Sequence, residues 1–82
     1  MMLEPIWYES AVRDLESLPH WREAEQVAAA VRLYAEQGIG FVRRVLNEEG
    51  PDEYRLYVGE FYVRVRTIGS QLHVERIVRW RW

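Results

Sequence analysis

The chain has 82 residues, of which 49% are hydrophobic and 29% charged, and it contains no cysteine. This length fits a single domain over residues 1–82, and the composition is that of a globular protein; the lack of cysteine excludes disulfides and cysteine-based metal sites. Apolar runs are too short for a membrane span and no signal-peptide pattern opens the chain, so we expect a cytoplasmic location and no membrane contact.

The charge is divided unevenly along the chain. Residues 1–53 carry five arginines against eleven acidic residues, a net of −6, whereas residues 54–82 carry six arginines against two glutamates, a net of +4. The sum of −2 does not suggest a nucleic-acid binder. A basic half can nevertheless form one anion-binding surface on an otherwise acidic body. The alternative is that the two halves neutralise each other across the fold.

The first half of the chain predicts a short strand and two helices. Residues 3–8 have strand character, and Pro5 restricts this strand to an edge. Ser10 is a candidate N-cap for a first helix, and Pro19 suits the first turn of a second. The second helix should end at Gly38, which favours a left-handed conformation. Its apolar stripe consists of Ala24, Val27, Ala28, Val31, Tyr34 and Ala35. We expect the two helices to form a hairpin, with Trp7 and Trp21 in the core.

The second half predicts four strands. They are expected over residues 41–46, 54–58, 61–68 and from 72 onward, because β-branched, aromatic and alternating apolar residues fill these segments. Gly59-Glu60 and Gly69-Ser70 fit two-residue type II′ turns. The apolar phase of the last strand slips by Ile77, which predicts a bulge near Glu75–Arg76. The element order β-α-α-β-β-β-β predicts an α+β fold, with the helical hairpin packed on one face of a mainly antiparallel sheet.

The two-residue turns also fix which residues lie opposite each other. One face carries the apolar pairs Val58–Phe61, Leu56–Val63, Tyr54–Val65, Thr67–Leu72 and Val65–Val74, and should lie under the helices. The other face carries Tyr57 opposite Tyr62, Arg55 opposite Arg64, Arg64 opposite Glu75 and Arg66 opposite His73.

The pair Arg55–Arg64 favours an anionic partner. Like charges directly opposite each other destabilise a sheet, so folding alone does not explain this pair. Binding of a nucleic acid would explain it, because guanidinium groups bind phosphate bidentately, while tyrosine and tryptophan rings stack on bases. The final residues Arg79-Trp80-Arg81-Trp82 add two cations and two stacking surfaces. The alternative is a solvated ladder of charges with the tryptophans against the core.

His73 is the histidine of the sheet region, and an imidazole suits proton transfer near neutral pH. The alternative is an incidental surface histidine. Glu75 is interpreted as the ion-pair partner of Arg64 rather than as a base.

Three stretches together resemble the RelE/ParE superfamily of bacterial toxins. Residues 54–63, YRLYVGEFYV, are similar to the strand–turn–strand of that family, residues 10–19 to its first helix with a leucine–proline exit, and residues 72–81 to its final strand. The likeness covers nearly the whole chain and depends on the order and spacing of the motifs.

This resemblance implies the toxin component of a type II toxin–antitoxin system, with a cognate antitoxin as partner. In the RelE branch it implies an mRNA interferase that inhibits translation, a ribosome-dependent endoribonuclease whose partners are the ribosome and mRNA. That chemistry is attack by the ribose 2′-hydroxyl on the adjacent phosphate, with no metal and no cofactor. The alternatives are a ParE-like DNA gyrase inhibitor and a catalytically degenerate binding protein of RelE fold. A homodimer and a hetero-oligomer with the antitoxin both stay open.

The resemblance also implies roles for individual residues. Arg55 matches the first basic position of the third strand, whereas Tyr57 and Tyr62 stand where the family often has basic residues. Arg64 lies two residues beyond Tyr62 and should share its face; the terminal tyrosine of the family is absent. We expect catalytic roles for Arg55, Arg64, His73, Arg79 and Arg81, and nucleic-acid contacts from Tyr57, Tyr62, Arg66 and Trp82.

Overall fold

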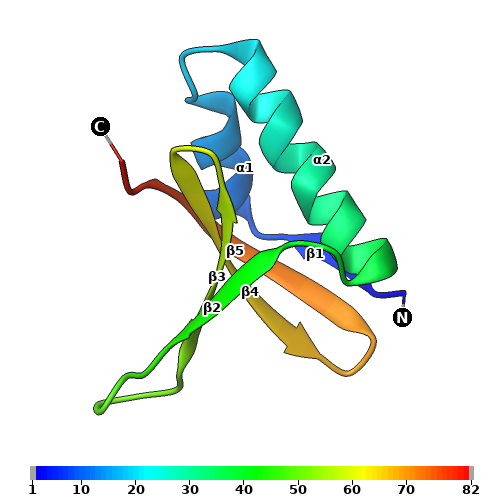
Figure 1. The fold of residues 1–82 in the computed structure, drawn as a ribbon, viewed down its shortest axis with the longest axis vertical. Helices are drawn as coiled ribbons and strands as arrows, with labels where there is room; N and C mark the ends of the chain where they lie inside the picture. The colour runs from blue at the N-terminus through cyan, green and yellow to red at the C-terminus, as the bar shows by residue number, and fades with distance from the viewer. Residues whose placement is uncertain (1, 82) are drawn as a thin grey trace.

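The computed structural model describes residues 2–81, which form two helices and five strands (Figure 1). In chain order these are β1 (Glu4–Trp7), α1 (Glu9–Glu16), α2 (Trp21–Gln37), β2 (Phe41–Val45), β3 (Glu53–Val58), β4 (Phe61–Ile68) and β5 (Gln71–Arg79). The strands form one sheet in the order β1-β5-β4-β3-β2. Only β1 and β5 pair in parallel within this sheet. The α+β fold and the predicted element order are confirmed.

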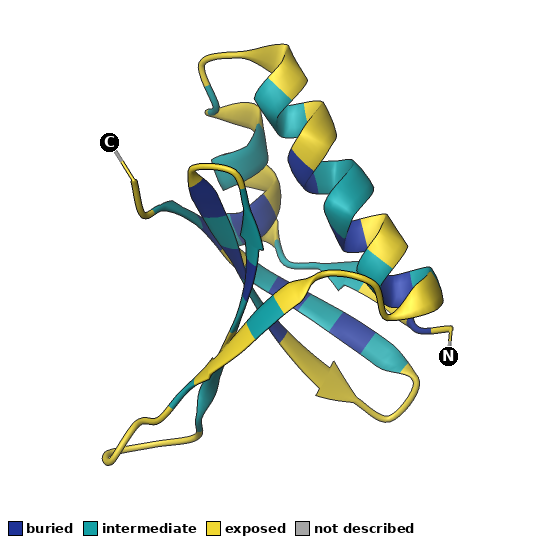
Figure 2. Cartoon of the chain, in the orientation of Figure 1, coloured by how far each residue is buried: buried dark blue, intermediate teal, exposed yellow. Residues whose placement is uncertain are grey.

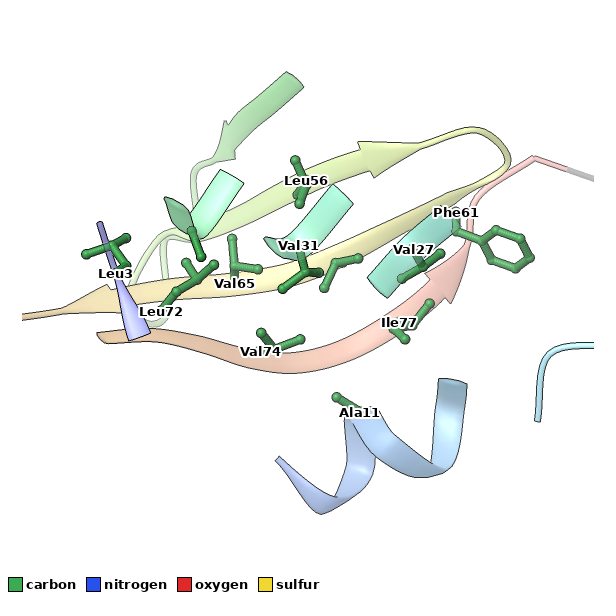
Figure 3. Close-up of a cluster of buried hydrophobic side chains, with 12 residues drawn as sticks. Leu3, Ala11, Val27, Val31, Leu56, Phe61, Val65, Leu72, Val74 and Ile77 are labelled. Atoms are coloured by element: carbon green, nitrogen blue, oxygen red, sulfur yellow. The ribbon is translucent and has the colours of Figure 1, made fainter. Parts of the chain in front are cut away.

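Both helices lie on one side of the twisted sheet (Figure 1). Between them and the strands lies the hydrophobic core (Figure 3), to which α2 contributes Val27, Val31 and Ala35. The alternating apolar residues of β3, β4 and β5 contribute Leu56, Phe61, Val63, Val65, Leu72, Val74 and Ile77. Every second side chain of a strand points to the same face, so these strands turn their remaining residues away from the helices. Within residues 2–81, neither helix has the length and apolar character that a bilayer crossing requires.

The starts of both helices differ from the predicted ones. Ser10 does not cap α1, because the helix begins at Glu9, one residue before Ser10. The Ser10 hydroxyl instead donates to the carbonyl oxygen of Glu75 at 2.8 Å. Pro19 precedes α2 instead of lying in its first turn, since the helix begins at Trp21. Trp21 itself is 70% exposed, so its expected place in the core was wrong. The predicted end of α2 is confirmed, because Gly38 has a φ of 69°.

The two predicted hairpin registers are confirmed, apart from the pair Arg64–Glu75. Between β3 and β4, Val58 faces Phe61 and Arg55 faces Arg64. Gly59 and Gly69 have φ values of 57° and 59°, and no non-glycine residue within 2–81 has a positive φ. This is the pattern of a type II′ turn, in which only the first central residue needs a positive φ. The open sheet face predicted from these registers therefore exists.

The bulge in β5 lies at Glu75, as the slip of the apolar phase predicted. Val65 faces Val74, but the next pair is Arg64 with Arg76, which leaves Glu75 without a register partner. Arg64 therefore faces Arg76 and not Glu75, although the Glu75 carboxylate still binds Arg64. A bulge adds one residue to one strand and shifts every later pairing, which explains the difference.

Helix α1 covers the edge of β5 beside this bulge. β1 pairs with β5 only as far as Val74, so the following backbone groups of β5 need other partners. Ser10 takes the Glu75 carbonyl, and the Asp14 carboxylate accepts from the Ile77 amide at 2.9 Å and from the Arg76 guanidinium at 2.8 Å. Burial acts to raise the pKa of Asp14, but these hydrogen bonds and the charge of Arg76 outweigh it and hold the pKa below its ordinary value.

We expect Asp14→Asn to lower the free energy of unfolding by about 1.5–3 kcal/mol at neutral pH, because a charged acceptor at the sheet edge is lost. Since the folded-state pKa lies below the ordinary value of 3.8, this contribution is present above that value and disappears as the pH falls through the folded-state pKa. Urea unfolding at about pH 7 and about pH 2.5 measures the difference between variant and wild type at both ends. An equal difference at the two pH values would contradict this role of the Asp14 charge.

Candidate nucleic-acid interface

The sheet face turned away from the helices, here called the open face, carries the basic and aromatic residues of β2 to β5. Its members are Phe41, Arg43, Glu53, Arg55, Tyr57, Tyr62, Arg64, Arg66, His73 and Glu75. They share this face because they alternate along their strands with the core residues. Four arginines stand against Glu53 and Glu75, so the face is net positive although the whole chain carries −2.

Three arginines form a row across the strands of the open face. Arg43 of β2 faces Arg55 of β3, and Arg55 faces Arg64 of β4. Arg76, the next register partner, turns instead to Asp14 of α1. Arg55 and Arg64 are neither sealed nor fully free, since their side chains are 28% and 43% exposed. The predicted opposition of Arg55 and Arg64 is thus extended by a third cation, Arg43.

Aromatic rings form a second row beside the arginines. Phe41 faces Tyr57, and Tyr57 faces Tyr62, with ring centroids 5.8 and 5.9 Å apart. Trp80 packs edge-on against Tyr57 at 5.5 Å, and its indole N–H donates to the Gly59 carbonyl at 3.2 Å. The rings of Phe41 and Trp80 remain largely accessible, at 64% and 47% exposure of their residues. Exposed neighbouring rings of this kind are able to stack on nucleobases.

On the open face, carboxylates of the same chain form ion pairs with the arginines that were predicted to bind phosphate. Glu75 pairs with both Arg64 and Arg66 at 3.2 Å, and Glu53 pairs with Arg55 at 2.9 Å. The hydrogen bond to Glu53 raises the pKa of Arg55 above its ordinary value, against the effect of burial. The Arg55 guanidinium also lies 4.4 Å from the centre of the Tyr62 ring. These contacts hold the guanidinium groups in place, and partly exposed pairs like these contribute little to stability.

His73 belongs to a hydrogen-bonded chain that the sequence did not predict. Its Nδ1 lies 2.8 Å from the Tyr8 hydroxyl and its Nε2 lies 3.1 Å from Gln71 Oε1. The Tyr8 oxygen also accepts from Arg66 at 3.3 Å, so its own proton is available to donate to His73. This hydrogen bond raises the pKa of Arg66, as does the charge of Glu75. Both ring nitrogens of His73 therefore have partners within the chain.

We expect Tyr8→Phe to lower the free energy of unfolding by about 0.5–1.5 kcal/mol, because it removes the hydroxyl that joins Arg66 to His73. Tyr54→Phe is the matched control, since it removes a tyrosine hydroxyl that has no hydrogen-bond partner among residues 2–81. Urea unfolding of the two variants measures both effects. Equal stability of the two variants would show that the Tyr8 hydroxyl contributes nothing.

The remaining predicted residues do not join this cluster. Arg79 lies on the helix side of the sheet: it faces the core residue Phe61, stacks on that ring at 4.8 Å, and pairs with Glu60 at 2.7 Å and Glu23 of α2 at 3.9 Å. The slip at the bulge places it there, because the bulge exchanges the faces of all later residues of β5. Arg81 is exposed, and its backbone amide donates to the Glu60 carbonyl. Trp82 lies outside the described residues.

Residues Arg43, Phe41 and Tyr8 were not predicted as members of the site, whereas Trp80 was expected as a stacking surface. The β2–β3 connection has seven residues between Val45 and Glu53, which is too long for a turn type to fix the register. Tyr8 reaches His73 only because β1 pairs in parallel with β5, where Ile6 faces His73. No local pattern carries that information.

No protein-family model matches the sequence, and no curated protein matches it. Among solved structures, the fold is similar to a chain of the RelB–RelE antitoxin–toxin complex from Methanococcus jannaschii. The TM-score is 0.63, the sequence identity is 14%, and the match covers 90% of this chain and 88% of that chain. The protein thus has a RelE-like fold, which confirms the fold expected from the sequence. At this identity the likeness concerns the fold alone.

Proposed function

We propose that this protein is the toxin component of a type II toxin–antitoxin system and that it cleaves mRNA on the ribosome. The observation that carries the proposal is the row Arg55–Arg64 on the open face of a RelE-like fold, beside the half-buried rings of Tyr57 and Tyr62. The structure of similar fold is an antitoxin–toxin complex. By this likeness, a cognate antitoxin is the expected protein partner, and cytoplasmic ribosomes and mRNA are the expected targets.

The chemistry expected of the open face is phosphate binding and orientation. Attack by a ribose 2′-hydroxyl on the adjacent phosphate develops negative charge on the phosphoryl oxygens, and Arg55 and Arg64 are placed to stabilise it. Tyr57 and Tyr62 would hold the flanking bases, and Arg66 would contact the backbone. His73 is the candidate for proton transfer. Because Tyr8 occupies its Nδ1, a proton moving to His73 at that nitrogen would pass through the Tyr8 hydroxyl.

One observation favours a second function, that of a non-cleaving binding protein of the same fold. Glu53 and Glu75 already pair with Arg55, Arg64 and Arg66, and Arg79 lies on the other side of the sheet. A phosphate would have to displace these carboxylates. An acidic segment of an antitoxin could compete for the same arginines without any chemistry.

A reconstituted translation reaction separates these functions. Purified protein is added to ribosomes translating a defined mRNA, and primer extension maps new 5′ ends. The proposal predicts cleavage within codons that requires ribosomes and is prevented by the antitoxin. Inhibition of gyrase supercoiling without mRNA cleavage would indicate a ParE-like toxin instead, and the absence of both would leave the binding protein.

A further inference from the structure

We propose that a single strand of RNA crosses the open face perpendicular to the β-strands, with its phosphates on Arg43, Arg55 and Arg64 and its bases on Phe41, Tyr57 and Tyr62. This inference rests on the proposed function and deepens it, because it assigns the direction of the strand and makes β2 part of the site. The new contacts are those of Phe41 and Arg43.

The two rows are parallel and regularly spaced. In each of β2, β3 and β4 the arginine and the aromatic residue are two positions apart: Phe41 and Arg43, Tyr57 and Arg55, Tyr62 and Arg64. Two residues of a strand rise about 6.5–7 Å, which separates the backbone positions of a row for phosphates from those of a row for bases. The Arg55 side chain spans the two rows, since its guanidinium lies 4.4 Å from the centre of the Tyr62 ring. The three strands span about 10 Å, which is room for roughly two or three bases, as on other sheets that stack RNA.

The β2 end of these rows is the part most available to a ligand. Figure 2 shows that β2 is largely exposed, in agreement with its burial pattern. Phe41 is 64% exposed, whereas Tyr57 and Tyr62 are half-buried. Arg43 is exposed and its guanidinium has no ion-pair or hydrogen-bond partner among residues 2–81, whereas Arg55 and Arg64 each bind a glutamate. A phosphate at Arg43 therefore displaces no carboxylate. The RNA would contact the β2 end of the two rows first.

Charge favours RNA over a protein partner on these rows. The ligand must offer negative charge every few ångströms along one line and flat rings along a second line. A single-stranded nucleic acid has this arrangement in every nucleotide, because each base has a π-face and each linkage one phosphate. An acidic peptide satisfies the arginine row but leaves the exposed ring of Phe41 without a partner of matching kind.

The test is the binding of a fluorescein-labelled oligouridylate of about five nucleotides to the full chain, measured by anisotropy over a series of salt concentrations. We expect Phe41→Ala to weaken binding about 5- to 150-fold with an unchanged salt dependence, because a stacked ring is lost but no phosphate contact. We expect Arg43→Ala to weaken binding and to lower the slope of log K against log salt by about 0.7, the value for one phosphate of a single strand.

Arg32→Ala is the matched control, because it removes one exposed arginine from α2, on the helix side of the sheet. It should leave the salt slope and the affinity nearly as in the wild type. The inference is overturned if the wild type does not bind the oligonucleotide, or if Phe41→Ala and Arg43→Ala behave like Arg32→Ala. It is also overturned if an acidic peptide displaces the RNA and the loss of bound RNA is equal in all three variants.

Ribosome-dependent cleavage is measured separately. Cleavage that needs Arg64 but not Arg43 or Phe41 refutes the proposed path of the RNA across the sheet and keeps the proposed function. Oligonucleotide binding with the expected pattern but without cleavage supports the proposed path of the RNA and refutes the proposed cleavage.

Discussion

Arg64→Ala should lower the rate of ribosome-dependent mRNA cleavage by about a hundred- to a thousandfold. Arg64 lies in the middle of the open face, between Arg55 and the bulged Glu75, and presents its guanidinium on the same side as the aromatic row. Loss of one preorganised donor to the charge that develops in a transition state has an effect of this size in other enzymes. The readout is the single-turnover rate of cleavage of a ribosome-bound message.

The fold should survive this substitution, so lost activity would report on the site. Glu75 keeps its pair with Arg66, and a half-exposed ion pair contributes about 0–1 kcal/mol. Arg32→Ala serves as the control for a general loss of positive charge, and Arg64→Lys keeps the charge but not the bidentate geometry. Full cleavage by Arg64→Ala would show that the predicted arginine has no role in the chemistry.

Leu56→Ala should lower the free energy of unfolding by about 2–5 kcal/mol. Leu56 of β3 belongs to the hydrophobic core under the helices and is 1% exposed (Figure 3). Its surroundings are tightly packed, since a Cβ added to Gly40 would lie 2.8 Å from Leu56 Cδ1. A chain of this size has a free energy of unfolding of roughly 4–12 kcal/mol, so the cavity left by this one substitution would remove a large part of it.

Leu46→Ala is the control for this prediction, because the same side chain is shortened at a position that is 71% exposed. We expect a change below about 0.5 kcal/mol there. Urea unfolding followed by circular dichroism measures both variants. A loss of less than 1 kcal/mol in Leu56→Ala would mean that the core under α2 relaxes around the cavity, contrary to the packing described.

The part of the sheet that the sequence predicted well is the part fixed by local rules. In the β3–β4 hairpin, a two-residue turn and strict alternation determine the register, so Arg55 opposite Arg64 followed from Gly59-Glu60. The bulge could be predicted because the apolar phase of β5 changes before Ile77. Its consequence for Arg79 was missed: one extra residue moves that side chain to the helix side.

Other features depend on contacts between distant segments, and no local pattern reveals them. Ser10 has the chemistry of an N-cap, but its hydroxyl satisfies the carbonyl of the bulge residue Glu75 instead. Trp21 stands at the start of α2 with its ring exposed, although large aromatic residues are usually buried. Arg43 and Phe41 entered the site only when the β2–β3 register was known. The missed members of the site are therefore those from elements joined by a long loop or by parallel pairing.

An amide chemical-shift map of the labelled protein tests most directly whether the open face is where RNA binds. Oligouridylate is added stepwise, and the shift of each backbone amide is followed. We predict saturable shifts in β2, β3 and β4, largest around Phe41, Arg43, Arg55 and Arg64, with α2 unchanged. Shifts confined to the helices, or no saturable shifts at all, would contradict RNA binding by this face of the sheet.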